Sequence, residues 1–299
     1  MSGEYDTLAS YAEPMEVISS LLRSMLKARG STRFLCADFS AIEGWVVSWL
    51  AGQETMMSYK DMASRIYNIP VEEIGDESDE RHVGKTAVLG AGFGMGGPKF
   101  KDTVYDWTGI RISDEMADYV IKGVYRVENK QIVDLWYELE RAALAAVRSP
   151  GMKVACGTHS CITYRVKGPY LWCVLPSGRA LCYPLPLIED RLTPWGFMKP
   201  AVVISTTNSV TRKWERRSLY GGLQTENIVQ AIARDVMAEA MLRVEQAGYP
   251  IVLTVHDEVL AEAQTGTLDA FCEIMRVTPE WAPGLHVGVK GWEGERYRK

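Results

Sequence analysis

The sequence lacks long apolar runs, a secretory leader and paired cysteines. Its longest apolar stretches, such as residues 45–51 and 251–255, are far too short to cross a bilayer, so no membrane contact is expected. The first ten residues have neither a basic start nor an apolar core, which predicts a cytoplasmic location. None of the 6 cysteines forms a C-x-x-C pair, which indicates reduced thiols.

Repeats, low-complexity tracts and an excess of positive charge are also missing. The 299 residues are 47% hydrophobic and 24% charged, as in soluble globular proteins of one large or two average domains. A net charge of -5 excludes a protein that coats polyanions through bulk charge, but leaves a local basic groove open. The basic residues cluster in two places, and such clusters are usually solvated faces: Lys199, Arg212, Lys213, Arg216 and Arg217, then Arg296, Arg298 and Lys299.

Two aspartates fall where an apolar strand gives way to a turn. Residues 33–39 form an apolar run that includes Asp38, and the apolar stripe after it predicts a helix that Gly52 ends. Residues 251–263 predict a strand, a two-residue turn and a second strand, with Asp257 at the tip. Either aspartate alone is more often a turn former. If the two strands are neighbours, the carboxylates repel each other and a divalent cation such as Mg²⁺ relieves the repulsion.

Further helices and strands are expected before, between and after the segments that carry the two aspartates. A helix should carry Arg81, Lys85 and Leu89 on one face until a glycine-rich stretch and Pro98 end it. Further predictions are an exposed loop over 71–80, helices over 113–127, 132–146 and 267–277, short strands over 149–222, a long helix capped by Thr225 and a strand over 285–289.

Arg81 and Lys85 are the second candidate site. Two cations on one helical face, ahead of small residues, can bind a triphosphate; a solvated basic edge is the alternative. Residues 92–97 also match G-x-G-x-x-G of dinucleotide-binding folds, but the helical spacing before them and Pro98 after them disfavour that hypothesis. Cys156, His159 and Cys161 lack a matching second pair of zinc ligands, so core cysteines are the better interpretation.

Three segments together resemble the motifs of the family-A DNA polymerases, the DNA polymerase I family, in the family's order. Residues 38–43 (DFSAIE) resemble motif A, residues 81–94 (RHVGKTAVLGAGFG) motif B and residues 255–258 (VHDE) motif C. Residues 226–235 are similar to the helix that precedes motif C. The resemblance spans residues 14–299 and is strongest to the bacteriophage or prophage branch, which implies a bacterial or phage-infected host cell.

The resemblance implies catalysis by two metal ions. Asp38 and Asp257 would ligate two Mg²⁺ ions, with the Phe39 carbonyl as a further ligand and Glu258 nearby. Lys85 completes the implied catalytic set. Such a site would transfer nucleotides from dNTPs to a primer 3′-hydroxyl, directed by a DNA template.

Substrate contacts are implied position by position. Arg81 and Lys85 would hold the triphosphate, Phe93 would stack at the insertion site, and Glu43 would block a ribose 2′-hydroxyl. Leu89 stands where the family usually has an aromatic residue that packs on the sugar. Primer and template contacts are expected from Arg179, Asn227, Gln230 and His256. Ala41 and Trp45 also depart from the family pattern, which bears on sugar discrimination and speed.

The implied fold is α+β, an antiparallel palm sheet with an inserted helical fingers subdomain. The expected division is palm over 1–52, fingers over 53–150 and palm over 151–299. Only 37 residues precede Asp38, so thumb and exonuclease domains are not expected; DNA binding should then be weak and distributive, and a separate polypeptide would supply the missing parts. Two rival hypotheses are a non-catalytic remnant that binds DNA or a partner, and a Rossmann-type oxidoreductase.

Overall fold

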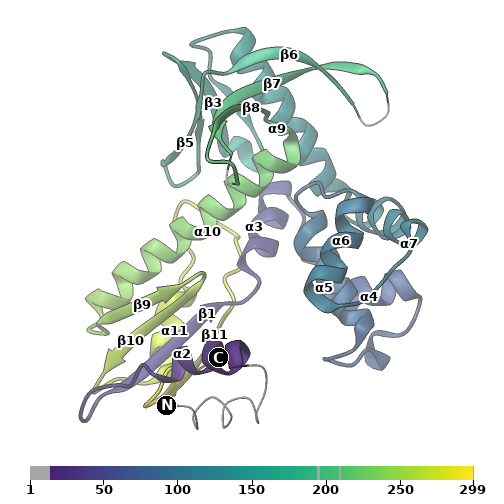
Figure 1. The fold of residues 1–299 in the computed structure, drawn as a ribbon. Coiled ribbons are helices and arrows are strands. Elements are labelled where there is room, and N and C mark those ends of the chain that lie inside the picture. Colours follow the sequence, from purple (N-terminus) through teal and green to yellow (C-terminus); the bar gives the residue numbers. More distant parts are fainter. Residues whose placement is uncertain (1–13, 194–195, 209, 299) are drawn as a thin grey trace. The chain divides into compact units, whose positions relative to one another are not determined.

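The computed structural model describes residues 14–193, 196–208 and 210–298 (Figure 1). The chain forms two compact units, each considered by itself. Unit 1 comprises Met1–Ile42, Arg234–Pro279 and Val287–Lys299, and unit 2 comprises Glu43–Ala233 and Glu280–His286. The division falls within the long helix α10 (Gly221–Gln246). The predicted palm and fingers boundaries remain a prediction.

Unit 1 is built on an antiparallel four-stranded sheet in the order β11-β1-β10-β9. Its elements are α2 (Pro14–Ser24), β1 (Arg33–Phe39), β9 (Ile251–Val255), β10 (Glu258–Ala263), α11 (Leu268–Arg276) and β11 (Val289–Gly294). Helix α11 packs against β1 and β11, close to Gly291. The opposite face of β1 carries Phe34, Cys36 and Asp38, because strand side chains alternate.

The first part of unit 2 is helical. Its elements are α3 (Ile42–Ala51), α4 (Tyr59–Tyr67), the short 3₁₀ helix η1 (Val71–Glu73), α5 (Asp79–Ala91), α6 (Gly97–Thr108), α7 (Asp114–Asp118), the π-helical η2 (Tyr119–Tyr125), α8 (Arg126–Glu128) and α9 (Lys130–Arg148). Where the structure describes the chain, none of its helices combines the length and the apolar character that a bilayer span needs.

Two antiparallel sheets follow the helices of unit 2. The first has the order β2-β3-β4-β5 and the second β6-β7-β8. Their elements are β2 (Val154–Cys156), η3 (Thr158–Ser160), β3 (Ile162–Lys167), β4 (Tyr170–Val174), β5 (Ala180–Pro184), β6 (Leu187–Leu192), β7 (Met198–Thr207) and β8 (Trp214–Ser218). The prediction of short strands over 149–222 is confirmed.

The two segments with the candidate aspartates fold as predicted. Residues 33–39 form β1, and α3 follows up to Gly52. Residues 251–263 form the β9–β10 hairpin, with His256 and Asp257 as its two-residue turn because Val255 pairs with Glu258. The predicted helices around Lys85, from Ser113 and over 132–146 are also present.

The prediction that Thr225 caps the long helix is wrong. Helix α10 begins four residues earlier, at Gly221, and the Thr225 hydroxyl donates to the Gly221 carbonyl at 2.9 Å. The Glu140 carboxylate on α9 accepts from the Gly221 amide at 2.9 Å. The first turn of α10 is therefore capped by a residue that is distant in sequence, and not by a local capping residue as expected.

The position of the closing strand was also predicted incorrectly. The closing strand is β11 (Val289–Gly294) and not residues 285–289, because pairing with β1 decides its position. A Cβ on Gly291 would lie 2.8 Å from the Cys36 carbonyl oxygen, so the glycine permits this pairing. The glycine-rich stretch ends α5 at Ala91 as predicted, whereas Pro98 sits in the first turn of α6, a helix that the sequence did not reveal.

Candidate active site

Three carboxylates gather at one end of the unit 1 sheet. Asp38 lies near the end of β1 and pairs in register with Glu258 of β10, so the two side chains share a face of the sheet. Asp257 precedes Glu258 in the hairpin turn, and its carbonyl accepts from the Phe39 amide at 3.2 Å. The two aspartates, 219 positions apart in the chain, are therefore neighbours, as their motif pattern predicts.

The surroundings of Asp38 oppose its ionisation. Partial burial raises the pKa of Asp38 above its usual value, and the neighbouring carboxylates of Asp257 and Glu258 raise that pKa further. Lys290, its register partner on β11, lowers the pKa of Asp38. One lysine thus faces three carboxylates, which is an arrangement that a divalent cation would stabilise.

Glu258 is held by two buried groups that the sequence did not identify. The Tyr297 hydroxyl donates to the Glu258 carboxylate, and the Cys36 thiol also hydrogen-bonds to it. Burial and this carboxylate raise the pKa of both Tyr297 and Cys36. Strand alternation from Asp38 could have indicated Cys36, but no local pattern pointed to Tyr297.

Helix α5 presents the predicted triphosphate residues along its accessible side. The Ser78 hydroxyl accepts from the Arg81 amide at 3.3 Å and caps the helix. Lys85 is exposed, and Arg81 and Leu89 are partly exposed. The buried side of the helix carries Val83, Thr86, Ala87 and Gly90. The buried side packs closely on α4, because a Cβ on Gly84 would lie 2.4 Å from the Tyr59 carbonyl oxygen. The predicted cationic face of this helix is therefore formed.

Phe93 lies in a turn that is fixed on both sides. The Trp136 indole donates to the Gly92 carbonyl at 2.8 Å from α9. From α10, Gly222 approaches so closely that a Cβ there would lie 2.2 Å from the Phe93 carbonyl oxygen. Gly94, with φ of +79°, completes the turn. Trp136 and Gly222 are structural supports that sequence patterns did not reveal.

Three of the predicted DNA-contacting residues lie together on unit 2. Asn227 and the exposed Gln230 are on α10, and the Asn227 amide donates to the Tyr183 hydroxyl at 3.2 Å. Arg179 donates to the Ala231 carbonyl of the same helix at 2.6 Å. The fourth, His256, belongs to unit 1, where it is exposed in the β9–β10 turn with φ of +53°.

Two residues at the start of unit 2 were also singled out. Glu43 lies in the first turn of α3 and is partly buried. Trp45, where the family often has arginine, packs its ring on His286 with a centroid distance of 4.3 Å. That contact gives the departure from the family pattern a packing role.

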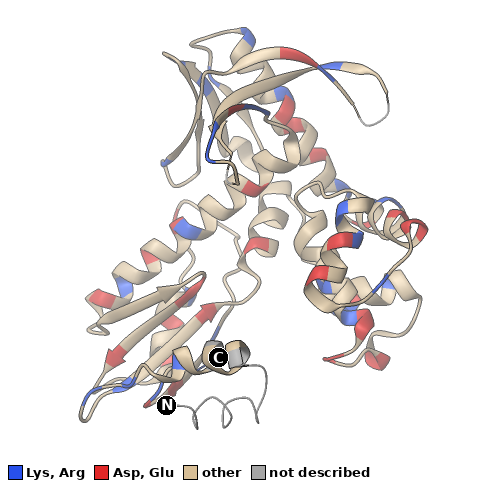
Figure 2. Ribbon diagram, viewed as in Figure 1, with Lys and Arg blue, Asp and Glu red and all other residues tan. Residues whose placement is uncertain are grey.

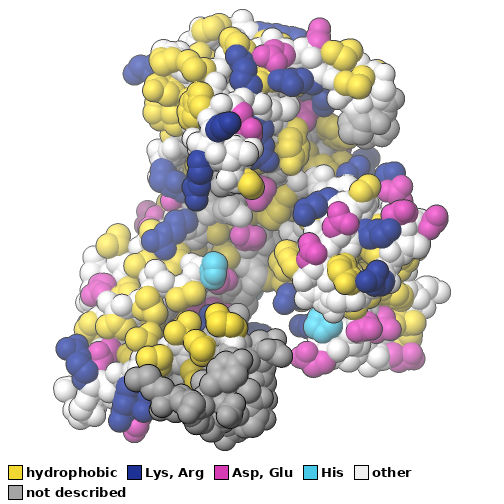
Figure 3. All heavy atoms as spheres, viewed as in Figure 1, with side chains coloured by type: hydrophobic (Ala, Val, Ile, Leu, Met, Phe, Trp, Pro, Cys, Tyr) yellow, Lys and Arg dark blue, Asp and Glu magenta, His cyan; other side chains and the backbone are white. Residues whose placement is uncertain are grey.

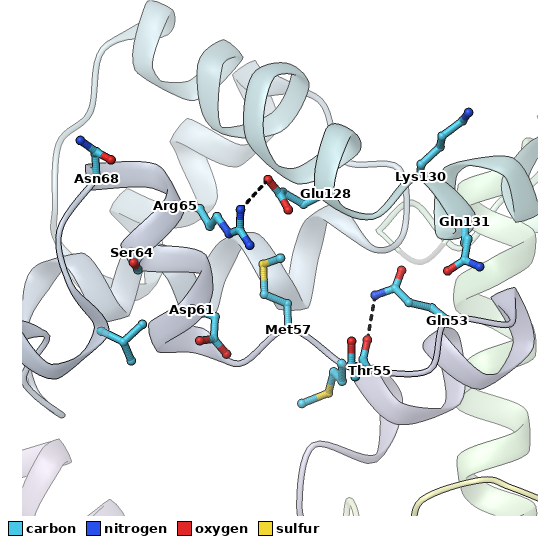
Figure 4. Close-up of a pocket in the computed structure, with 12 residues that line it drawn as sticks. Gln53, Thr55, Met57, Asp61, Ser64, Arg65, Asn68, Glu128, Lys130 and Gln131 are labelled. Atoms are coloured by element: carbon cyan, nitrogen blue, oxygen red, sulfur yellow. Dashed lines mark hydrogen bonds and ion pairs between the residues drawn. The ribbon is translucent and has the colours of Figure 1, made fainter.

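A polar pocket of about 800 Å³ also lies in unit 2 (Figure 4). Arg65 and Glu128 pair across it at 3.1 Å, and Gln53, Asp61 and Lys130 are among its lining residues. None of the predicted catalytic or substrate-binding residues lines it. The pocket is therefore separate from the motif residues.

The geometry disfavours the two alternative sites. Residues 86–91, the strand that a dinucleotide fold would need, belong to helix α5. Cys156 is buried and Cys161 is partly buried, as in the core-cysteine interpretation. Within residues 14–193, 196–208 and 210–298, no three His, Cys, Asp or Glu side chains form a metal-binding group.

The carboxylate cluster nevertheless fits magnesium. Mg²⁺ is commonly held by one or two carboxylates, with water and substrate phosphates as its other ligands. Asp38 and Asp257 supply hard oxygen ligands at one strand end. Burial and then repulsion by neighbouring carboxylates raise the pKa of Asp38, and a cation would relieve that repulsion.

Comparison with known proteins agrees with the motifs. The chain is 34% identical over 315 aligned residues to a DNA polymerase of Bacillus phage SP02, and the match covers 99% of this chain. The predicted resemblance to a phage DNA polymerase is confirmed. This chain spans about half, 46%, of the length of that curated relative.

A solved structure has the same fold. It is the POL domain of Pol1 from M. smegmatis in complex with DNA primer-template and dNTP, matched with a TM-score of 0.53 and 18% identity over 92% of this chain and 42% of that one. The predicted α+β fold with antiparallel sheets is confirmed. No protein-family model matches the chain.

Proposed function

We propose that this chain carries the catalytic residues of a template-directed DNA polymerase that transfers dNTPs to a primer 3′-hydroxyl. The observation that carries the proposal is the meeting of Asp38, Asp257 and Glu258 at one strand end. The motifs that contain these residues resemble those of family-A polymerases in residue type and in order along the chain. In addition, 99% of the chain aligns with a phage DNA polymerase.

In this proposal the carboxylates hold two Mg²⁺ ions. Asp38 and Asp257 are the ligands, and the Phe39 carbonyl adds a backbone oxygen. The ions would lower the pKa of the primer hydroxyl and neutralise charge on the leaving pyrophosphate. The Glu258 carboxylate accepts hydrogen bonds from the buried Tyr297 and Cys36 side chains. The two aspartates are therefore the more available metal ligands.

The nucleotide-binding residues lie on α5 and the turn after it. Arg81 and Lys85 bind the triphosphate as cations, and Phe93 stacks on the base or sugar of the incoming dNTP. Leu89, one turn beyond Lys85, offers an aliphatic surface where the family has an aromatic one. Glu43 excludes the ribose 2′-hydroxyl. Catalysis is then mostly positioning and charge stabilisation.

The primer-template contacts are assigned to α10 and the β9–β10 turn. Arg179, Asn227 and Gln230 contact the DNA near the primer terminus, and His256 contacts it beside Asp257. The Tyr183 and Ala231 hydrogen bonds preorder two of these side chains. Base pairing supplies the sequence choice, so the side chains need only shape and backbone contacts.

Primer extension tests this function directly. Purified protein with Mg²⁺ and four dNTPs should extend a labelled primer, and with single dNTPs it should add only the nucleotide complementary to the template. Asp257→Ala should reduce extension by at least a thousandfold, because it removes a metal ligand that acts in the transition state.

The control is Asp106→Ala, which alters an exposed carboxylate on α6. Equal extension by wild type and Asp257→Ala, or no extension by a folded wild type that binds primer-template, would contradict the proposal. The second result would favour a non-catalytic DNA-binding subunit.

A further inference from the structure

A preordered turn joins β7 and β8 in unit 2. The Asn208 side-chain oxygen accepts from the amides of Val210 and Thr211, each at 2.9 Å, and its side-chain nitrogen donates to Glu215 at 3.0 Å. The Arg212 amide closes the turn on the Asn208 carbonyl at 2.9 Å. These bonds order the backbone of the described turn residues, Asn208 and 210–212, so the side chains of 210–212 are presented in a defined arrangement.

Positive charge is concentrated on one face of the β6-β7-β8 sheet. The register places Arg191 opposite Lys199 and Arg216 opposite Ser205, and alternation puts all three cations on the same face. We call this the basic face. It contains one carboxylate, Glu189, whereas the opposite face holds Asp190, Glu215 and Arg217.

The carboxylates near the basic face leave net positive charge. Glu189 accepts from both Arg191, at 2.7 Å, and Arg216, at 3.3 Å, and Glu140 of α9 accepts from Lys199 at 2.7 Å, so two carboxylates face three cations of the sheet. The turn adds Arg212 and Lys213, both exposed, and among the described residues neither has an ion-pair partner. Figure 2 shows basic positions, together with acidic ones, in and around β8. In a chain of net charge -5, this is a local attraction for an anionic ligand.

An exposed aromatic side chain adjoins these cations. Trp214 begins β8 on the basic face, and 61% of it is exposed. Val210 at the tip of the turn is 88% exposed. Figure 3 shows basic and hydrophobic side chains side by side over this sheet. Cations that bind phosphates next to an aromatic ring that stacks on a base are the combination that binds single-stranded nucleic acid.

We propose that the basic face and its turn bind single-stranded DNA. Arg212, Lys213 and Arg216 contact backbone phosphates, and Trp214 stacks on an unpaired base. None of these residues belongs to the three motifs, so the site is additional to the contacts assigned to α10. The inference takes the proposed DNA substrate as given, and an unpaired stretch of template strand is the ligand.

Binding without catalysis tests the charge contribution. A fluorescein-labelled oligothymidylate is titrated in EDTA, without dNTP, and its anisotropy is followed over a range of salt concentrations. Each single-strand phosphate contact contributes about 0.7 to the slope of log K against log salt, so Arg212→Ala/Lys213→Ala should reduce that slope by about 1.4. The matched control is Lys122→Ala/Lys153→Ala, which removes the same charge from two exposed lysines of unit 2 and should leave the slope unchanged.

The stacking contribution has a different signature. Trp214→Ala should weaken binding by about tenfold without changing the salt slope, and Trp214→Phe should retain most of the affinity. With an abasic oligonucleotide, wild type and Trp214→Ala should bind equally, because the phosphates remain and the bases are gone.

Three results would overturn the proposal: no binding of oligothymidylate by wild type, a salt slope that falls equally in the control variant, or a Trp214→Ala defect that persists with abasic DNA. If the basic face instead binds an acidic protein, the wild type should not bind oligothymidylate, which is the first of these results. Because the assay contains no metal or dNTP, failure here leaves the Asp257-dependent extension test untouched, and failure of that test leaves this one interpretable.

Discussion

Asp38 lies where its charge is unfavourable for folding. Burial and the carboxylates of Asp257 and Glu258 raise its pKa, and only Lys290 opposes them among the interactions of this side chain with charged neighbours. A group whose pKa is higher in the folded state stabilises the fold below its unfolded pKa and loses that contribution as pH rises through the folded value. At neutral pH the ionised Asp38 therefore destabilises unit 1, which is the expected cost of a metal-binding site.

Asp38→Asn should raise the thermal unfolding midpoint by a few degrees at pH 7 in the absence of Mg²⁺. The gain should shrink as the pH falls through the raised pKa of Asp38, because the wild-type side chain then binds its proton. Added Mg²⁺ should raise the wild-type midpoint but not that of the variant, and primer extension should be lost. Differential scanning fluorimetry across pH, with and without Mg²⁺, measures these shifts.

Asp106→Asn is the matched control for this substitution, since Asp106 is exposed on α6. It should leave the midpoint and its pH dependence close to wild type. An Asp38→Asn protein that is less stable than wild type at pH 7 would show that burial of the charge and repulsion together do not outweigh the favourable interactions of that side chain.

At the scale of elements, the contact between the turn after α5 and the start of α10 fixes the position of Phe93. Backbones approach so closely here that both Gly221 and Gly222 are needed: a Cβ on Gly221 would lie 2.2 Å from the Trp136 carbonyl oxygen. Backbone atoms cannot yield as a flexible side chain can, so the fit depends on the absence of side chains.

Gly222→Ala should therefore destabilise the protein by about 1–3 kcal/mol, the usual cost of overpacking. The added methyl group would displace the Phe93 carbonyl, so KM for dNTP should rise several-fold while binding of primer-template stays the same. Urea unfolding and steady-state single-nucleotide insertion measure the two effects.

Gly75→Ala provides the comparison, because a Cβ there would meet only the Ser78 side chain at 3.7 Å and its backbone at 4.0 Å. That variant should stay within about 0.5 kcal/mol of wild type. If Gly222→Ala changed stability without changing KM, Phe93 would not be positioned by this contact.

At the scale of the whole molecule, unit 1 is assembled from three chain segments, and the first of them lies far in sequence from the other two. Strand β1 is hydrogen-bonded on both sides, to β10 and β11, and four consecutive residues of it are buried. In unit 2, β6 is an edge strand of its sheet, and most of its side chains are exposed. Local opening should therefore be much rarer at β1 than at β6.

Hydrogen exchange measured by mass spectrometry should show this order. Peptides covering residues 33–39 should exchange among the slowest of the chain, and peptides covering 187–192 should exchange orders of magnitude faster. Similar protection of the two strands would contradict the expected difference between a doubly paired, buried strand and an exposed edge strand.

Sequence patterns predicted most elements that have a local cause. The apolar run of β1, the Val255–Glu258 turn and the Ser113 cap all depend on residues within a few positions of one another. Helix α6 was missed because Pro98 is compatible with a first helical turn as well as with a helix end. Thr225 was misplaced because the start of α10 is stabilised by Glu140, which lies 81 positions from Gly221.

The sequence by itself determined which residues can do the chemistry: two aspartates at strand ends, cations at helical spacing and their order along the chain. Tertiary structure decided which residues meet them. It placed Glu258 and Lys290 beside Asp38, Tyr297 against Glu258, and Trp136 and Gly222 against the Phe93 turn. The physical reason is the sequence separation of the interacting residues. Side-chain periodicity indicates only contacts within a turn or a strand. Strand order and close backbone approach arise from packing between segments that lie far apart in the chain.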